Sequence, residues 1–89
     1  MKHAGAAALA ELAALLAEIR RLPGLVERRP GIFYRRAQAW LHFHEDAAGL
    51  FADVKLGAAP KFERFRVSTT QEQQALLAAL RTTAATTPP

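Results

Sequence analysis

Apolar residues recur at helical spacing near the start of the chain. From about Ala6 to Leu22, leucine and isoleucine return every third or fourth position, and Glu11 and Glu18 lie off that stripe, as in an amphipathic helix. The pair Pro23-Gly24 ends the helix, because proline cannot continue the backbone ladder. The sequence therefore predicts a first helix over residues 6–22.

In the middle of the chain the period changes to two, and aromatic and β-branched residues are concentrated between short turns, which is typical of strands. Four strands are predicted, approximately Ile32–Arg35, Ala39–Glu45, Leu50–Leu56 and Phe62–Val67. Turns near Ala37-Gln38, at residues 46–49 and at residues 57–60 join them. Since each connection is short, an antiparallel meander is expected.

A second helix is predicted after Ser68. Thr69 can cap its first amides, and Glu72 can reach back to form a capping box. Residues 82–89 have too little apolar content to pack. The prediction is one α+β domain over residues 1–81, followed by a disordered tail at 82–89. Its two layers are a four-stranded antiparallel meander and the N- and C-terminal helices on one face (α-β-β-β-β-α).

Alternation along each strand assigns side chains to opposite faces. Leu41 and Phe43 belong to the core, and pairing His44 with Phe51 keeps the other apolar partners there as well. The same parity sets Phe33 beside His42. The uncovered face is then predicted to carry Phe33, Arg35, Trp40, His42, His44, Phe51, Asp53, Lys55, Arg64 and Arg66.

Three large aromatic residues on an uncovered face form the kind of patch that marks an interface. Three interpretations stay open. Arg35 or Lys55 shelters Trp40 through a cation–π contact, the face joins two copies of the chain, or it binds a ligand or nucleic acid.

The composition of the chain excludes several kinds of site and of protein. The 89 residues contain no cysteine, which excludes disulfides and thiolate metal sites. The net charge of +4 comes mostly from arginine, which permits nucleic-acid binding but is also common in GC-rich genomes. No apolar stretch is long enough to cross a membrane and no export signal is evident, so a cytoplasmic location without membrane contact is expected.

The segment from His42 to Asp46 is the one local cluster that resembles a site. His42 and His44 share a strand face, and Asp53 is predicted opposite His42, so these three residues are candidate metal ligands. The structural interpretation fits better, with Asp53 orienting His42 and pairing with Arg64, and no metal site is predicted. The sequence has no serine nucleophile elbow and no phosphate loop, so no catalytic residue and no cofactor are predicted.

The chain also carries a resemblance to known families. The order of a helix, Leu22-Pro23-Gly24-Leu25, an aromatic hairpin, His42-x-His44 and Gly49-Leu50-x-x-Asp53 resembles small bacterial domains labelled luciferase-family, which have no established reaction. The Leu-Pro-Gly element and hairpin are similar to those of MmcQ/YjbR-like domains, which implies an α+β fold associated with DNA binding.

The sequence favours a binding module over an enzyme. The expected partner of the uncovered face is a second copy of the chain, or an unidentified protein or ligand. One alternative is sequence-independent nucleic-acid binding, with arginines on phosphates and aromatics stacked on bases. The second alternative is a metal-dependent site at His42, His44 and Asp53.

Overall fold

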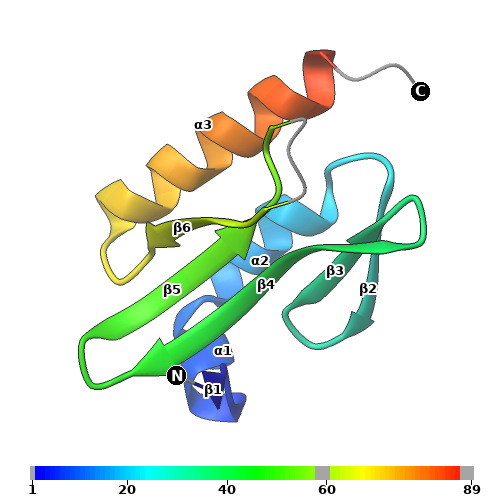
Figure 1. Cartoon of the computed structure of the whole chain (residues 1–89). Helices are drawn as coiled ribbons and strands as arrows, with labels where there is room; N and C mark the ends of the chain where they lie inside the picture. The colour runs from blue at the N-terminus through cyan, green and yellow to red at the C-terminus, as the bar shows by residue number, and fades with distance from the viewer. Residues whose placement is uncertain (1, 58–60, 87–89) are drawn as a thin grey trace.

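The computed structural model describes residues 2–57 and 61–86. Its elements are β1 (Lys2–His3), α1 (Ala6–Glu11), α2 (Ala13–Arg20), β2 (Leu25–Arg29), β3 (Ile32–Arg35), β4 (Gln38–Asp46), β5 (Gly49–Val54), β6 (Glu63–Arg66) and α3 (Thr70–Thr86). The strands form one antiparallel sheet in the order β2-β3-β4-β5-β6, and β1 pairs with β4 (Figure 1).

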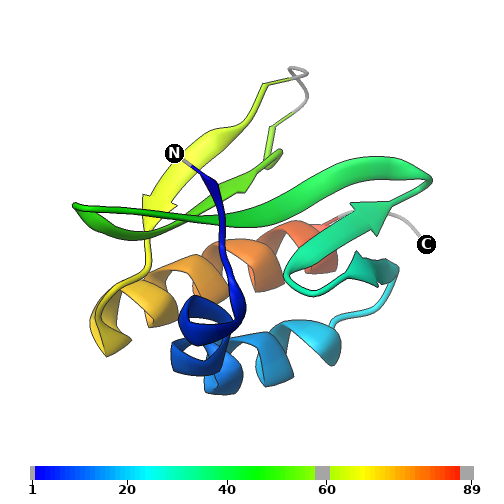
Figure 2. The ribbon, with the colours of Figure 1, turned by 90° about the horizontal axis from the view of Figure 1, so that it is seen from below.

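All three helices lie on one side of this sheet (Figure 2). The predicted α+β class and antiparallel sheet are therefore confirmed. The predicted four-stranded meander is incomplete, because β2 extends it at one edge and β1 adds a short sixth strand. The opposite side of the sheet carries no helix in the described part of the chain, and we call it the open face.

The predicted first helix is divided at Leu12. This residue leaves helical geometry with φ −95° and ψ 7°, and its amide donates to the carbonyls of Ala8 and Leu9. The apolar stripe continues across the break, since Leu12, Leu15, Leu16 and Ile19 are buried, and Leu9 and Leu22 are partly buried against the same core. The second part ends at Arg20, two positions before the predicted end at Leu22.

The core lies between the helices and the sheet. It contains Leu12, Leu15, Leu16, Ile19, Phe33, Trp40, Leu41, Phe43, Ala52, Val54, Val67, Leu76, Leu77 and Leu80. Burial of aliphatic and aromatic side chains is the main favourable term in folding, so this cluster holds the helices to the sheet.

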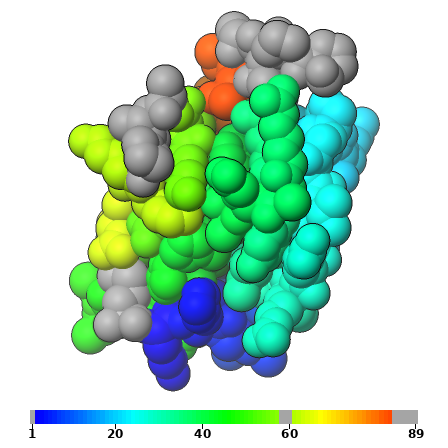
Figure 3. Space-filling model, turned by 45° about the vertical axis from the view of Figure 1, so that its right-hand side comes forward, coloured from blue at the N-terminus to red at the C-terminus, as the bar shows by residue number. Residues whose placement is uncertain are grey.

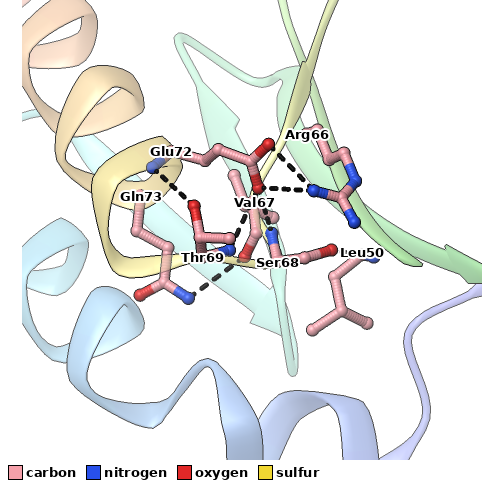
Figure 4. Close-up of polar contacts among 7 residues, drawn as sticks. All are labelled: Leu50, Arg66, Val67, Ser68, Thr69, Glu72 and Gln73. Carbon is pink, nitrogen blue, oxygen red and sulfur yellow. Dashed lines mark hydrogen bonds and ion pairs between the residues drawn. The ribbon is translucent and has the colours of Figure 1, made fainter. Parts of the chain in front are cut away.

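The start of α3 confirms the predicted capping box (Figure 4). Thr69 Oγ1 accepts the amide hydrogen of Glu72 at 3.1 Å, and Glu72 Oε1 accepts that of Thr69 at 3.0 Å. The helix continues to Thr86, past Thr82, where the tail was predicted to begin. Residues 87–89 lie outside the described residues. Among the described helices, none has the length and apolar character needed to cross a membrane.

The predicted register of β4, β5 and β6 is confirmed. His44 lies opposite Phe51, and His42 lies opposite Asp53. Asp53 in turn lies opposite Arg64. Because these strands pair without a register shift, the parity argument holds across all three.

The register of β3 against β4 was predicted wrongly by one residue. Ile32 lies opposite His42, and Phe33 lies opposite Leu41. A shift of one residue moves a strand side chain to the other face of the sheet. Phe33 therefore points into the core, where it is 1% exposed, and not onto the open face.

A β-bulge on β4 accompanies this error. The neighbouring residues Phe33 and Tyr34 pair with Leu41 and Ala39, so Trp40 is an extra residue with no partner on β3. A bulge re-aims side chains relative to strict alternation. Trp40 and Leu41 are consequently both buried, and the predicted position of Trp40 on the open face is also wrong.

The turn between β3 and β4 suggests a stabilising change. Arg36 and Ala37 have φ of 53° and 65°, the positive values that a type I′ turn requires at both central positions and that glycine adopts most easily. Ala37→Gly is expected to stabilise the domain by about 1 kcal/mol. That gain would raise Tm by about 4–8 °C in a thermal melt.

The matched control is Ala75→Gly, at an exposed position within α3. There glycine is expected to cost about 1 kcal/mol, since it weakens a helix interior relative to alanine. Equal losses of Tm in both variants would contradict the left-handed conformation at Ala37.

Candidate metal centre

The open face gathers all three histidines of the chain. Alternation along β4 points His42 and His44 outward, and β1 lies against β4 so that His3 is paired with His44. Figure 3 shows the N-terminal segment, in blue, against the green surface of the central strands. Residues far apart in sequence thus form one histidine cluster, defined here as His3, His42 and His44.

Polar contacts hold β1 in this place. The amide of Ala4 donates to the carbonyl of Phe43 at 3.0 Å, and the amide of Gly5 donates to the Glu45 carboxylate at 2.8 Å. This bond, with the charge of Lys2, lowers the pKa of Glu45. The Glu45 carboxylate is therefore bound to the N-terminal segment, and it holds the segment that carries His3 against β4.

The ring nitrogens of the cluster face one another. Nδ1 of His42 and Nε2 of His44 are 2.5 Å apart, and the His3 ring stacks on that of His44 with centroids 4.9 Å apart. One ligand atom from each residue lies within 4.8 Å of the others. Nδ1 of His44 is buried without a hydrogen-bond partner in the described part of the chain, and its Nε2 makes the contact with His42.

Asp53 borders the cluster on β5. Its Oδ2 is 3.4 Å from Nε2 of His44, and both of its oxygens accept hydrogen bonds from Arg64 at 2.8 Å. These bonds are the main cause of the lowered pKa of Asp53, so the carboxylate is charged at neutral pH. Of the structural role predicted for Asp53, the pair with Arg64 is confirmed, whereas the imidazole contact given for its carboxylate is with His44 and not with His42.

The pKa values of His42 and His44 beside it are lowered, which favours the uncharged form of both rings. Burial lowers the pKa of both His42 and His44, and proximity to His44 lowers that of His42 further, while Asp53 opposes the shift in both. A neutral imidazole offers a lone pair, and metal ligation requires that form.

The residue types and spacing fit a transition-metal ion. Imidazole nitrogen suits zinc, copper, iron and nickel, and zinc binds it at about 2.0–2.1 Å. A tetrahedral ion would hold two such nitrogens about 3.3 Å apart. The nitrogens of His42 and His44 are 2.5 Å apart, less than an ångström from that spacing, and the ligand atoms of all three histidines lie within 4.8 Å of one another.

The ten predicted face residues have three different outcomes. Phe51, Arg64 and Arg66 lie on the strands that keep the predicted parity, with His42, His44 and Asp53. Lys55 directly follows β5, and its amide donates to the carbonyl of Trp40. Phe33 and Trp40 are buried. Arg35 lies opposite Gln38 rather than Trp40, yet its guanidinium carbon is 5.3 Å from the centre of the Trp40 ring, which is the predicted cation–π contact.

Two members of the site were missed from sequence. His3 reaches the cluster only through β1, a two-residue strand without a readable period. The ring of Phe62, 39% exposed, lies edge-on to His42 with centroids 4.6 Å apart and shelters the cluster on the β6 side. The presence of three histidines in the whole chain was the available signal for His3.

Comparison of the chain with protein-family models, with curated proteins and with solved structures gave no match. The resemblances to luciferase-family and MmcQ/YjbR-like domains therefore stay predictions.

Proposed function

We propose that this domain binds a divalent transition-metal ion, zinc foremost, through His3, His42 and His44 on the open face. The observation that supports the proposal is the convergence of every histidine in the chain, from positions 3, 42 and 44, with ligand atoms within 4.8 Å of one another. Surface histidines scattered at random would not converge in this way.

The proposed ligand set has a chemical consequence. Three imidazoles leave one position of a tetrahedral zinc ion open, as in catalytic zinc sites rather than structural ones. The Asp53 carboxylate lies beside the cluster, where its negative charge favours a cation. Two hydrogen bonds from Arg64 hold that carboxylate in place. Asp53 is therefore proposed to lie beside the ion as a fixed negative charge and not to bind it as a ligand.

The other expected uses of the open face receive less support. Of the three aromatics expected to stack on bases, Phe33 and Trp40 are buried. Arg64 and Arg66, expected on phosphates, are paired with Asp53 and Glu72. Self-association through the open face stays a prediction.

Calorimetric titration of tag-free protein with zinc chloride tests the metal site. One ion per chain is expected for the wild type. His3→Ala is expected to weaken binding at least about 100-fold, since loss of an outer-shell partner alone costs 10–100-fold. His3 is exposed, so this variant keeps the core intact, and His44→Ala is expected to act in the same direction.

Lys55→Ala is the matched control, because Lys55 follows β5 but contributes no nitrogen to the cluster. Its zinc affinity is expected to equal that of the wild type. Absence of zinc binding, or binding that His3→Ala and His44→Ala leave unchanged, would overturn the proposal.

A further inference from the structure

A groove on the open face begins at the histidine cluster. It is lined by His3 and His42 of the cluster, by Phe62, and by residues of β2 and β3 that include Arg28, Arg29 and Tyr34. Figure 3 shows the cyan to green surface of β2, β3 and β4 lying side by side on this part of the molecule. The groove therefore joins the proposed metal ion to the basic edge of the sheet.

The groove is positively charged. Its lining among the described residues includes no acidic residue, and neither Arg28 nor Arg29 forms an ion pair with a carboxylate in that part of the chain. The Arg28 guanidinium instead lies 4.7 Å from the centre of the Tyr34 ring. By contrast, Arg20, Arg64, Arg66 and Arg81 all pair with carboxylates.

The arginines, the proposed metal ion and the aromatic rings of the groove together suit an organic molecule that carries an oxyanion. Guanidinium groups bind oxyanions through pairs of parallel hydrogen bonds. A three-histidine zinc site has an open position that an oxygen ligand can occupy. The rings of Tyr34 and Phe62 offer apolar area for an organic group, as is usual in small-molecule sites.

We infer that this groove binds a small phosphate monoester, with one phosphate oxygen on the metal ion and the others on Arg28 and Arg29. Phosphate is favoured over carboxylate because a dianion matches a divalent ion flanked by two arginines, whereas a carboxylate carries a single charge. The organic group then lies between Tyr34 and Phe62. This inference rests on the proposed metal site.

Cobalt-loaded protein tests the inference, because the visible spectrum of cobalt responds to a change of ligand. Phenyl phosphate is the probe. Its addition is expected to alter the cobalt spectrum and to give a saturable binding isotherm, with weaker binding of benzoate. Arg28→Gln/Arg29→Gln is expected to weaken phenyl phosphate binding at least about 10-fold, since hydrogen bonds to charged groups are among the stronger ones.

The control is Arg21→Gln/Arg81→Gln, which also removes two arginine charges, but from the helical side, where both arginines pair with Glu18. This variant is expected to bind phenyl phosphate like the wild type. Failure to bind cobalt would remove both proposals. Cobalt binding that requires His3, with no spectral response to phenyl phosphate, would overturn only this inference. Equal phenyl phosphate binding without metal, or tighter binding of benzoate, would also overturn it.

Discussion

Phe33→Ala is expected to destabilise the domain by about 3–5 kcal/mol, because the substitution removes a whole aromatic ring from the core and leaves a cavity. Phe33 is 1% exposed and belongs to the main cluster of buried residues. Urea unfolding followed by circular dichroism measures the loss. If the alanine variant does not fold, Phe33→Leu keeps most of the volume and is expected to lose less.

Phe62→Ala is the matched control, since Phe62 is 39% exposed on the other side of the sheet. Its expected loss is about 1 kcal/mol, in proportion to the smaller apolar area that it buries. Similar small losses for both variants would place Phe33 on the open face, as strict alternation predicts, and would contradict the observed register of β3.

The contrast between these two residues shows where prediction from sequence succeeded and where it failed. Alternation is a statement about parity, so it holds only while two strands pair without an extra residue. Between β4 and β5 no residue is inserted, and His42, His44 and Asp53 lie where they were predicted. The bulge at Trp40 is a single insertion, and it inverts the faces of β3.

The missed strands have a different cause. β2 is an edge strand, and its sequence Leu-Val-Glu-Arg-Arg carries too few apolar residues to show a period. β1 has only two residues and is defined by its pairing with β4. Since the period of a pattern needs several residues to be visible, only the tertiary pairing identifies either segment as a strand.

In the candidate site, too, the part set by local alternation was predicted and the part set by tertiary pairing was missed. The sequence placed two histidines on one strand face and offered Asp53 as a candidate third ligand, while favouring its pairing with Arg64. That pairing is the one observed. The third imidazole comes from His3, across a pairing of segments some forty residues apart. A site assembled by such a contact cannot be derived from local spacing, although the count of histidines pointed to it.

Gly49→Ala is expected to cost about 3 kcal/mol and to disturb the start of β5. Gly49 has a φ of 135°, outside the conformations that side-chain-bearing residues adopt readily, which costs about 1–3 kcal/mol. An added Cβ would also strike Oγ of Ser68. That oxygen accepts the amide hydrogen of Leu50 at 2.9 Å, and losing the bond costs about 1 kcal/mol more.

Gly24→Ala separates the two contributions. Gly24 also has a positive φ, 81°, but an added Cβ there meets nothing within 4 Å, so the expected cost is about 1 kcal/mol from the backbone alone. In a Ser68→Ala background the hydroxyl is absent, and Gly49→Ala is expected to cost about 1 kcal/mol less than in the wild type. Two results together would show that no close contact fixes the start of β5. These are equal losses of unfolding free energy for Gly24→Ala and Gly49→Ala, and the same loss for Gly49→Ala with and without the Ser68 hydroxyl. The register that sets Asp53 beside the histidine cluster would then depend on the cross-strand pairs alone.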